Sequence, residues 1–273
     1  MPELPEVETV RASLAPKLVG RRFDDVQILD SRLTRPLAPA EVAAELAGER
    51  VTAVDRRGKY LILRFESGLV LLIHLRMTGN LFHSRNGALA EGHVRAVVRL
   101  DDGSDVVYRD VRRFGTWLVL GADELDAYLA ARLGREPLDG SFSARDLGER
   151  LAARKLPLKA ALLDQRTVAG VGNIYADEAL WRARLHPVRP AGELAPRELT
   201  ALHRGLRRAL EAGIERQGAT LRDYRTPDGT AGSMQLEFKV YGRGGEPCPR
   251  CGTPIAKTRL GGRGTWFCPA CQR

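Results

Sequence analysis

The last 26 residues of the chain contain all four of its cysteines, and this feature most constrains how the chain can fold. Cys248, Cys251, Cys268 and Cys271 have the spacing C-x2-C-x16-C-x2-C. Each close pair forms a tight knuckle, and two knuckles complete a tetrahedron around zinc. The prolines and glycines beside the pairs favour two turns joined by a β-hairpin. Because four thiolates leave no open position for a substrate, the spacing predicts one structural Zn²⁺.

The same tail is strongly basic. Residues 239–273 carry seven Lys or Arg against one acid. Between the knuckles, residues 260–265 read Leu-Gly-Gly-Arg-Gly-Thr, which predicts a hairpin tip where glycines let the backbone approach a ligand and from which Arg263 projects. A basic finger that contacts phosphate is one interpretation, and a solvated charged loop is the other.

Composition limits the class of protein. With 273 residues, 44% of them hydrophobic, the chain can bury a sizeable core, and its net charge of +9 favours a polyanionic partner. No apolar run approaches the roughly 20 residues needed to span a bilayer, and the acidic N-terminus lacks the pattern of a signal peptide. We expect a cytoplasmic protein with no membrane partner and no organic cofactor. The cysteines are too localised for a disulfide framework.

Hydrophobic periodicity divides the chain into two patterns. Residues 3–19 predict a helix, because Val7, Val10, Leu14 and Leu18 recur at helical spacing. Short β-rich runs then extend to residue 120, which predicts an antiparallel β-sandwich carrying a terminal helix. The expected strands are 51–54, 60–65, 69–75, 94–100, 106–108 and 116–120.

After Gly121 the pattern becomes helical, and turn residues at 134–137 suggest the boundary between the two patterns. The sequence thus predicts an α+β protein with domains at 1–133, 134–238 and 239–273. The expected helices are 123–133, 143–154, 158–165, 173–183 and 196–217.

The N-terminus offers a nucleophile. If Met1 is removed, Pro2 presents a secondary amine, and α-amino groups titrate near ~8 rather than near ~10.4 as lysine does. Such an amine can attack an aldehyde-like carbon and form a Schiff base. The helix dipole beginning beside it disfavours protonation. The alternative is that Met-Pro marks only a stable terminus.

A glycine-rich turn joins two of the predicted helices. Residues 170–173 read Gly-Val-Gly-Asn, which permits a hairpin whose backbone N–H groups face a phosphate, with Asn173 at the start of the following helix. A plain helix-helix turn explains the same residues. The basic finger favours a second phosphate clamp.

These features occur together with further motifs, and jointly they cover essentially the whole chain. In order, the motifs are Pro2-Glu3-Leu4-Pro5-Glu6-Val7-Glu8, Gly58-Lys59-Tyr60-Leu61, His74-Leu75-Arg76-Met77, Arg112-Arg113-Phe114-Gly115, Gly170-Val171-Gly172-Asn173-Ile174-Tyr175 and the four cysteines. The chain resembles bacterial formamidopyrimidine-DNA glycosylase. The resemblance implies a helix-two-turn-helix element, excision of oxidised purines from double-stranded DNA, and cleavage of the abasic strand by β,δ-elimination.

The resemblance also implies catalytic roles. Pro2 would attack C1′ of the damaged nucleotide, while Glu3 protonates the opening sugar or a nearby leaving oxygen. Lys59 would assist β-elimination, and Arg263 would stabilise charge in δ-elimination. Glu6 is either a companion carboxylate near the base or an acid that favours the helix dipole.

Binding roles follow in the same way. A flipped base leaves a gap that a wedge must fill, and the matching residues are Met77, Arg112 and Phe114. Glu178 and residues 218–239 are candidates for the base pocket. The expected contacts with the DNA backbone are His74, His93, Arg112, Arg154, Lys155, Lys159 and Asn173.

Two rival interpretations remain. The sister endonuclease VIII type resembles this fold and acts on oxidised pyrimidines, but Leu4 favours the purine enzyme. A non-enzymatic zinc-finger DNA-binding protein would use the phosphate clamps alone. We expect a cytoplasmic monomer that associates with the nucleoid during repair.

Overall fold

The computed structural model describes residues 1–85, 92–152 and 154–273. Contacts divide the chain into two compact units, an N-terminal unit of residues 1–131 with 216–233 and a C-terminal unit of residues 132–215 with 234–273. The predicted domains at 1–133, 134–238 and 239–273 remain a prediction, and the contact division differs by grouping 216–233 with the N-terminal unit. No helix among the described residues is long and apolar enough to cross a membrane.

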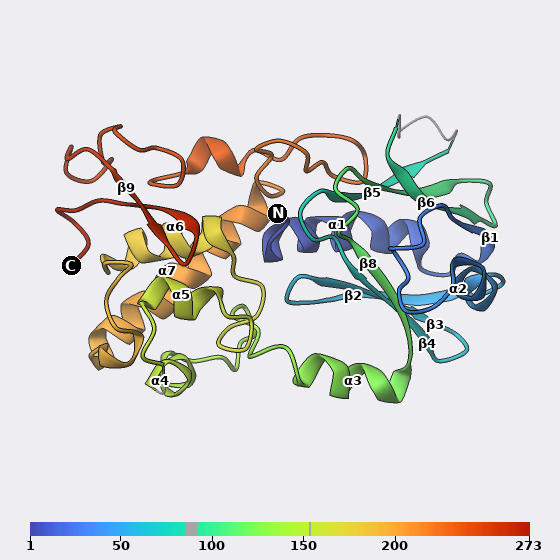
Figure 1. The fold of residues 1–273 in the computed structure, drawn as a ribbon, viewed down its shortest axis with the longest axis horizontal. Helices are drawn as coiled ribbons and strands as arrows, with labels where there is room; N and C mark the ends of the chain where they lie inside the picture. Colours follow the sequence, from blue (N-terminus) through green and yellow to red (C-terminus); the bar gives the residue numbers. More distant parts are fainter. Residues whose placement is uncertain (86–91, 153) are drawn as a thin grey trace. The chain divides into compact units, whose positions relative to one another are not determined.

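Two antiparallel four-stranded sheets form the N-terminal unit (Figure 1). One sheet has the order β2 (Val51–Arg57), β3 (Tyr60–Phe65), β4 (Leu69–His74), β8 (Thr116–Gly121). The other has the order β1 (Phe23–Ile28), β6 (Val94–Leu100), β7 (Asp105–Asp110), β5 (Gly79–Ser84). Apolar side chains of both sheets are buried in one core. The predicted antiparallel β-sandwich is confirmed.

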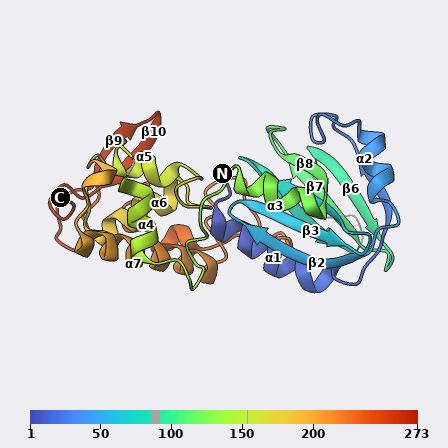
Figure 2. The same ribbon diagram turned by 90° about the horizontal axis from the view of Figure 1, so that it is seen from below.

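The first helix, α1 (Leu4–Leu18), packs against β2 and β3 (Figure 2). The four apolar residues that predicted this helix, from Val7 to Leu18, are all buried in the sandwich core. Burial of that stripe stabilises the helix and fixes the position of its first turn, which follows Pro2 and the N-cap residue Glu3. Two shorter helices, α2 (Pro39–Leu46) and α3 (Ala122–Ala130), complete the covering elements.

Residues 216–233 return to the N-terminal unit and are held there by hydrogen bonds from backbone N–H groups. The His83 N–H donates to the Pro227 carbonyl at 3.0 Å, and the Arg225 N–H donates to Asn80 Oδ1 at 2.9 Å. These bonds attach residues 216–233 to β5. The rest of the loop predicted for the base pocket, residues 234–239, belongs to the C-terminal unit.

The C-terminal unit is helical and ends in a β-hairpin. The helices α6 and α7 pack closely, and a Cβ at Gly205 would lie 2.8 Å from the Ala179 carbonyl, so a larger residue there would push them apart. The helical elements are α4 (Ala144–Ala152), α5 (Leu158–Leu163), α6 (Asn173–Ala183), η1 (Ala191–Glu193), α7 (Pro196–Glu215) and η2 (Met234–Glu237).

The predicted hairpin is formed by β9 (Ala256–Leu260) and β10 (Arg263–Phe267). Gly261 and Gly262 make the two-residue loop, with φ of +53° and +75°. Positive φ at both central residues gives a turn whose twist matches the flanking strands, and glycine adopts it without strain. The turn places Arg263 at the start of β10, exposed to solvent.

Candidate functional site

The predicted nucleophile lies at the start of α1. Pro2 is buried, and Glu3 follows it as the extended N-cap residue, with φ −105° and ψ −172°. The Glu3 N–H donates to Glu6 Oε2 at 2.8 Å. This bond fixes the backbone beside Pro2, so the proline nitrogen and the Glu3 carboxylate stay adjacent.

Glu6 links this terminus to the returning segment. Its Oε1 accepts the Ala219 N–H at 2.8 Å, and its carboxylate is almost fully buried. Gly218 has φ +81°, and a Cβ there would lie 2.7 Å from Glu6 Cγ. A helix-dipole role alone does not explain these contacts. Glu6 therefore joins the first turn of α1 to the 216–233 loop.

Lys59 occupies the tight turn between β2 and β3. Arg57 pairs with Tyr60, so Gly58 and Lys59 form a two-residue loop, in which Gly58 has φ +58°. Positive φ at the first central position requires glycine in this turn type. The Lys59 side chain is only 4% exposed. It is therefore held within the fold instead of extending into solvent.

His74 ends β4 opposite Tyr60, and the two rings pack edge to face with centroids 4.7 Å apart. Its Nδ1 accepts the Arg76 N–H at 3.0 Å. Burial, with the charges of Arg76 and Lys59, lowers the pKa of His74 to about 3. The ring is therefore neutral, and its proton resides on Nε2, which can donate to a phosphate oxygen.

This burial predicts a stability change with pH. Between pH 6.5 and 3 the unfolded chain protonates His74 and the folded chain does not. Above pH 6.5 neither state protonates His74, so His74 does not reduce the free energy of unfolding. As the pH falls from 6.5 toward 3, the free energy of unfolding decreases by about 1.4 kcal/mol per pH unit. We expect His74→Gln to reduce the loss of unfolding free energy between pH 7 and pH 4.5, measured by urea denaturation. An unchanged loss would contradict the buried neutral ring.

The three predicted wedge residues lie together on two loops of the N-terminal unit. Arg112 Nη1 donates to Met77 Sδ at 3.1 Å, and the Arg112 guanidinium lies 4.8 Å from the centre of the Phe114 ring. Met77 is 40% exposed and Phe114 51% exposed. Large apolar side chains at core positions would be buried, so these residues are available to contact a ligand.

A buried carboxylate supports the wedge. Asp110 Oδ2 accepts the Gly115 N–H at 2.8 Å, and Oδ1 accepts the Arg112 N–H at 3.2 Å. Thr78 Oγ1 donates to the same carboxylate and accepts the Arg112 N–H at 3.0 Å. Asp110 therefore joins the loop after Met77 to the loop that carries Arg112 and Phe114. No motif in the sequence marks Asp110.

His93 directly precedes β6 and is exposed, with φ +59°. Its carbonyl accepts the Asp110 N–H at 3.0 Å. The His93 backbone is thus bonded to Asp110, the residue that supports the wedge, while the His93 ring stays accessible to solvent. This exposure is compatible with the phosphate contact predicted for it.

Lys159 differs from its predicted role as a phosphate contact. Its side chain is 0% exposed. Nζ donates to the Gly264 carbonyl at 2.8 Å and to Thr265 Oγ1 at 2.9 Å, and it lies 2.8 Å from Asp177 Oδ1. Since these three contacts engage the ammonium in the interior, Lys159 supports the hairpin instead of facing solvent.

Two further bonds complete this support. Asp177 Oδ2 accepts the Trp266 N–H at 3.0 Å, and Asn173 Nδ2 donates to the Gly264 carbonyl at 3.0 Å. Asn173, the first residue of α6, therefore holds β10 directly. Burial raises the pKa of Asp177, and the charge of Lys159 opposes that increase. The chain beside Arg263 is thereby fixed to α5 and α6.

This buried pair leads to a stability prediction. Removing one partner leaves the other charge buried, so Lys159→Met should lower the unfolding free energy by about 3–5 kcal/mol. In Lys159→Met with Asp177→Leu, neither charge remains, and we expect much of the loss to be recovered. Guanidinium denaturation of wild type, Lys159→Met, Asp177→Leu and the double variant measures the coupling free energy between the two side chains. Additive losses would contradict direct pairing.

Arg154 and Lys155 precede this cluster. Arg154 Nη1 pairs with Asp164 Oδ2 at 2.8 Å and is half-buried, whereas Lys155 is exposed. Of the two cations, Lys155 is better placed to reach an anion in solution. The Arg154 guanidinium is paired with Asp164, and its phosphate contact stays a prediction.

Glu178 does not have the contacts of a base-pocket residue. It is fully buried, and its Oε1 accepts three backbone N–H groups, from Lys239 at 2.9 Å, Val240 at 2.9 Å and Tyr241 at 3.1 Å. Its Oε2 pairs with Arg182 at 2.9 Å. These bonds occupy the carboxylate, so Glu178 anchors the turn that leads into the tail, and the base-pocket role stays a prediction.

The four cysteines form the predicted metal site. Their Sγ atoms all lie within 4.8 Å of one another, and Cys251 Sγ lies 3.5 Å from Cys268 Sγ. Tetrahedral Zn–S bonds of ~2.3 Å place sulfurs roughly 3.8 Å apart, so the cluster fits zinc. Trp181 Nε1 donates to Cys248 Sγ at 3.4 Å, a contact suited to a thiolate. Zinc here would hold both knuckles and leave no open coordination position.

Three family models match successive parts of the chain. They are the formamidopyrimidine-DNA glycosylase N-terminal domain over residues 1–117, the formamidopyrimidine-DNA glycosylase H2TH domain over 133–225, and the zinc finger found in FPG and IleRS over 245–273.

Full-length relatives have the same name. Formamidopyrimidine-DNA glycosylase of Roseiflexus sp. (strain RS-1) is 47% identical and that of Symbiobacterium thermophilum 48% identical, each over 100% of this chain and over 100% and 89% of the respective relative. Among solved structures, a Lactococcus lactis FPG mutant with Fapy-dG containing DNA has a TM-score of 0.93 at 37% identity, covering 100% of both chains. Lactococcus lactis Fpg with abasic site containing DNA has a TM-score of 0.92 at 37% identity, covering 99% of both chains. This chain belongs to the formamidopyrimidine-DNA glycosylase family.

Proposed function

We propose that this chain is a bifunctional DNA glycosylase and AP lyase of base excision repair, which removes 8-oxoguanine and formamidopyrimidines from double-stranded DNA. One observation carries the proposal: Pro2 is followed by a fixed Glu3, in the same unit as a buried Lys59 and an exposed wedge. A protein that only bound DNA would have no need of an ordered terminal nucleophile.

In the first step, the Pro2 nitrogen attacks C1′, and the glycosidic bond breaks as the base leaves with its electrons. The attacking nitrogen loses its proton, which the departing base takes up through solvent. The nitrogen lone pair then forms the C=N⁺ bond as C1′–O4′ breaks. Glu3 supplies the proton that O4′ takes up. The product is an open sugar joined to Pro2 as an iminium ion.

In the second step, a proton leaves C2′, its electron pair forms the C2′=C3′ bond, and the 3′ phosphate departs. Lys59 assists this β-elimination as a nearby base. In the later δ-elimination a proton leaves C4′, a C4′=C5′ bond forms, and the bond from C5′ to the phosphate oxygen breaks. The Arg263 guanidinium stabilises the negative charge on the departing phosphate. A guanidinium is a poor proton donor, so we assign Arg263 no acid role.

The wedge and the cations bind the DNA. Met77 and Phe114 replace the stacking lost when the damaged base leaves the helix, and Arg112 hydrogen-bonds the orphaned partner base. His74, His93, Arg154 and Lys155 contact phosphates. Zinc, when bound, fixes the finger that presents Arg263. We further propose that the enzyme acts as a monomer in the cytoplasm, at the nucleoid.

The phosphate contacts predict a change in salt dependence. Each phosphate contact that is lost should reduce the log-log slope of affinity against salt by about 0.9. We expect Lys155→Ala to show this reduction in fluorescence anisotropy titrations from 50 to 200 mM salt. Arg145→Ala removes the same charge from an exposed position on α4 and is the control, expected to leave the slope near wild type. Equal slopes for Lys155→Ala and wild type would remove the Lys155 contact.

A second substrate class deserves a direct comparison, because one similar structure is a Lactococcus lactis Fpg complex with an oxidized pyrimidine containing DNA. The test compares single-turnover excision from duplexes with 8-oxoguanine opposite cytosine, thymine glycol opposite adenine, and no lesion. We expect faster excision of 8-oxoguanine. A strong preference for thymine glycol would assign the chain to oxidised pyrimidines, and binding without excision would leave a DNA-binding protein.

A further inference from the structure

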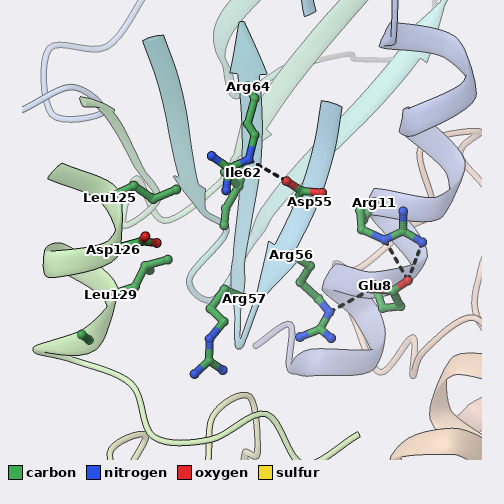
Figure 3. Close-up of a pocket in the computed structure, with 11 residues that line it drawn as sticks. Glu8, Arg11, Asp55, Arg56, Arg57, Ile62, Arg64, Leu125, Asp126 and Leu129 are labelled. Atoms are coloured by element: carbon green, nitrogen blue, oxygen red, sulfur yellow. Dashed lines mark hydrogen bonds and ion pairs between the residues drawn. The ribbon is translucent and has the colours of Figure 1, made fainter. Parts of the chain in front are cut away.

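A pocket of about 700 Å³ in the N-terminal unit lies beside the turn that carries Lys59 (Figure 3). Its walls come from α1, β2, β3 and α3, and several of its lining residues are charged. Figure 3 shows two separate groups of ion pairs, one between α1 and β2 and the other between β2 and β3. The first group connects two parts of the proposed active site.

Arg56 makes the connection. Its Nε donates to Glu8 Oε2 at 2.9 Å, and its Nη1 donates to the Gly58 carbonyl at 3.1 Å. The Arg56 side chain is 10% exposed, so these bonds form largely out of water. Low exposure and two directions of donation hold the guanidinium in one orientation.

Glu8 is fixed from its other side. Its Oε1 accepts the Arg11 Nε–H at 2.8 Å, within α1 itself. Burial acts to raise the pKa of Glu8, but hydrogen bonds from Arg11 and Arg56 hold it below its ordinary value. The carboxylate is therefore ionised at neutral pH, and it presents one oxygen to each arginine.

The contacts from Glu8 through Arg56 to the Gly58 carbonyl form a relay. Each end of this relay lies beside a proposed catalytic group. Glu8 lies about one helical turn after Leu4, the first residue of α1, and Glu3 is the N-cap residue of the same helix. The Gly58 carbonyl belongs to the residue directly before Lys59, in a turn with positive φ. A shift of Arg56 would therefore move the Lys59 turn relative to the start of α1.

We propose that Arg56, held by Glu8, is a positioning residue that sets the Lys59 turn against the N-terminal nucleophile. This inference rests on the proposed function and deepens it, because it assigns the relay to strand cleavage more than to base excision. Base excision requires Pro2 and Glu3, which have their own bond through Glu6. β-elimination also requires Lys59 to reach C2′ of the iminium.

The test is Arg56→Lys. An ammonium retains the charge and can pair with Glu8, but it lacks the planar fork that reaches the Gly58 carbonyl at the same time. Arg64→Lys is the matched control, since Arg64 lines the same pocket and its Nε donates to Asp55 at 2.8 Å, away from the turn. Glu8→Gln is a second variant, expected to act in the same direction more weakly. Thermal melting establishes that each variant is folded.

Two rates are measured on one 8-oxoguanine duplex under single-turnover conditions. Alkali treatment of quenched samples reports base excision, and untreated samples report enzymatic strand cleavage. We expect Arg56→Lys to lower the ratio of cleavage to excision by at least about tenfold, because misplacement of a reacting group by 1 Å can cost more than this. The ratio for Arg64→Lys should equal that of wild type.

Borohydride trapping supplies a second readout. When elimination slows after the iminium forms, the iminium persists, so Arg56→Lys should give more trapped adduct than wild type at early times. An equal loss of both rates, or an unchanged ratio, would overturn the positioning role. If the wild-type chain gives no adduct, the proposed function fails first, and that outcome is distinct from failure of the relay.

Discussion

Blocking the nitrogen of Pro2 with an uncleaved N-terminal extension should abolish lesion excision and strand cleavage. The nitrogen would then belong to an amide, whose lone pair is delocalised and cannot attack C1′. We expect the single-turnover excision rate to fall by on the order of 10⁴-fold or more, as it does when the nucleophile of a covalent catalyst is lost. Gel analysis of an 8-oxoguanine duplex measures this rate.

Pro2→Gly provides an intermediate case. A terminal glycine retains a primary amine but gives a neutral imine that must still be protonated, whereas proline gives an iminium that is already cationic. The expected order of rates is wild type, then Pro2→Gly, then the extended chain. Full activity of the extended chain would exclude Pro2 as the nucleophile, and DNA affinity close to wild type would show that the extension has not blocked binding.

Cys268→Ser should release the finger from its metal. Cys268 is buried, its Sγ lies 3.5 Å from Cys251 Sγ, and its N–H donates to Gln272 Oε1 at 2.8 Å. Structural zinc contributes roughly 10–16 kcal/mol to the folding of small finger peptides, so its loss should disorder residues 239–273. We expect zinc content to fall below one per chain and DNA affinity to fall by at least about 100-fold.

Limited proteolysis separates a local effect from a global one. Cleavage confined to residues 239–273, with residues 1–131 protected, is the expected pattern. Chelation of the wild-type protein should reproduce it. Wild-type affinity in a zinc-free Cys268→Ser protein would mean that the finger does not depend on metal.

Much of the fold could be predicted because its signals are local. The apolar stripe of α1, the short apolar runs of β3 and β4, and the cysteine spacing each predict one element of the structure. The sequence analysis did not single out β1 and β5, the outer strands of their sheet. Their sequences, Phe-Asp-Asp-Val-Gln-Ile and Gly-Asn-Leu-Phe-His-Ser, carry polar residues that weaken the strand pattern.

The site was harder to predict where function depends on burial. Lys155 and Lys159 are four residues apart and look alike in the sequence, but Asp177 and the hairpin enclose only Lys159. Glu178 is occupied by backbone donors some 60 residues away in the chain. Contacts at such distances in sequence arise from tertiary packing, so no local motif reveals them.

Supporting residues were missed for the same reason. Asp110 belongs to no motif. Its place in the sequence was still a signal, because an acid that ends the strand β7 two residues before Arg112 can accept hydrogen bonds from the following loop. Arg56 stands beside Arg57, and only the structure distinguishes the one that reaches the Gly58 carbonyl. Motifs therefore located the groups proposed to react, and the structure identified the residues that hold them.

The most direct test of the central claim is covalent trapping. The purified protein is mixed with an 8-oxoguanine duplex and borohydride, and mass spectrometry locates any DNA adduct on the chain. We predict a single adduct on the nitrogen of Pro2, with Met1 absent, because reduction of the iminium fixes the sugar at that atom. An adduct on Lys59 or another lysine, or none despite DNA binding, would contradict Schiff-base catalysis by the terminal proline.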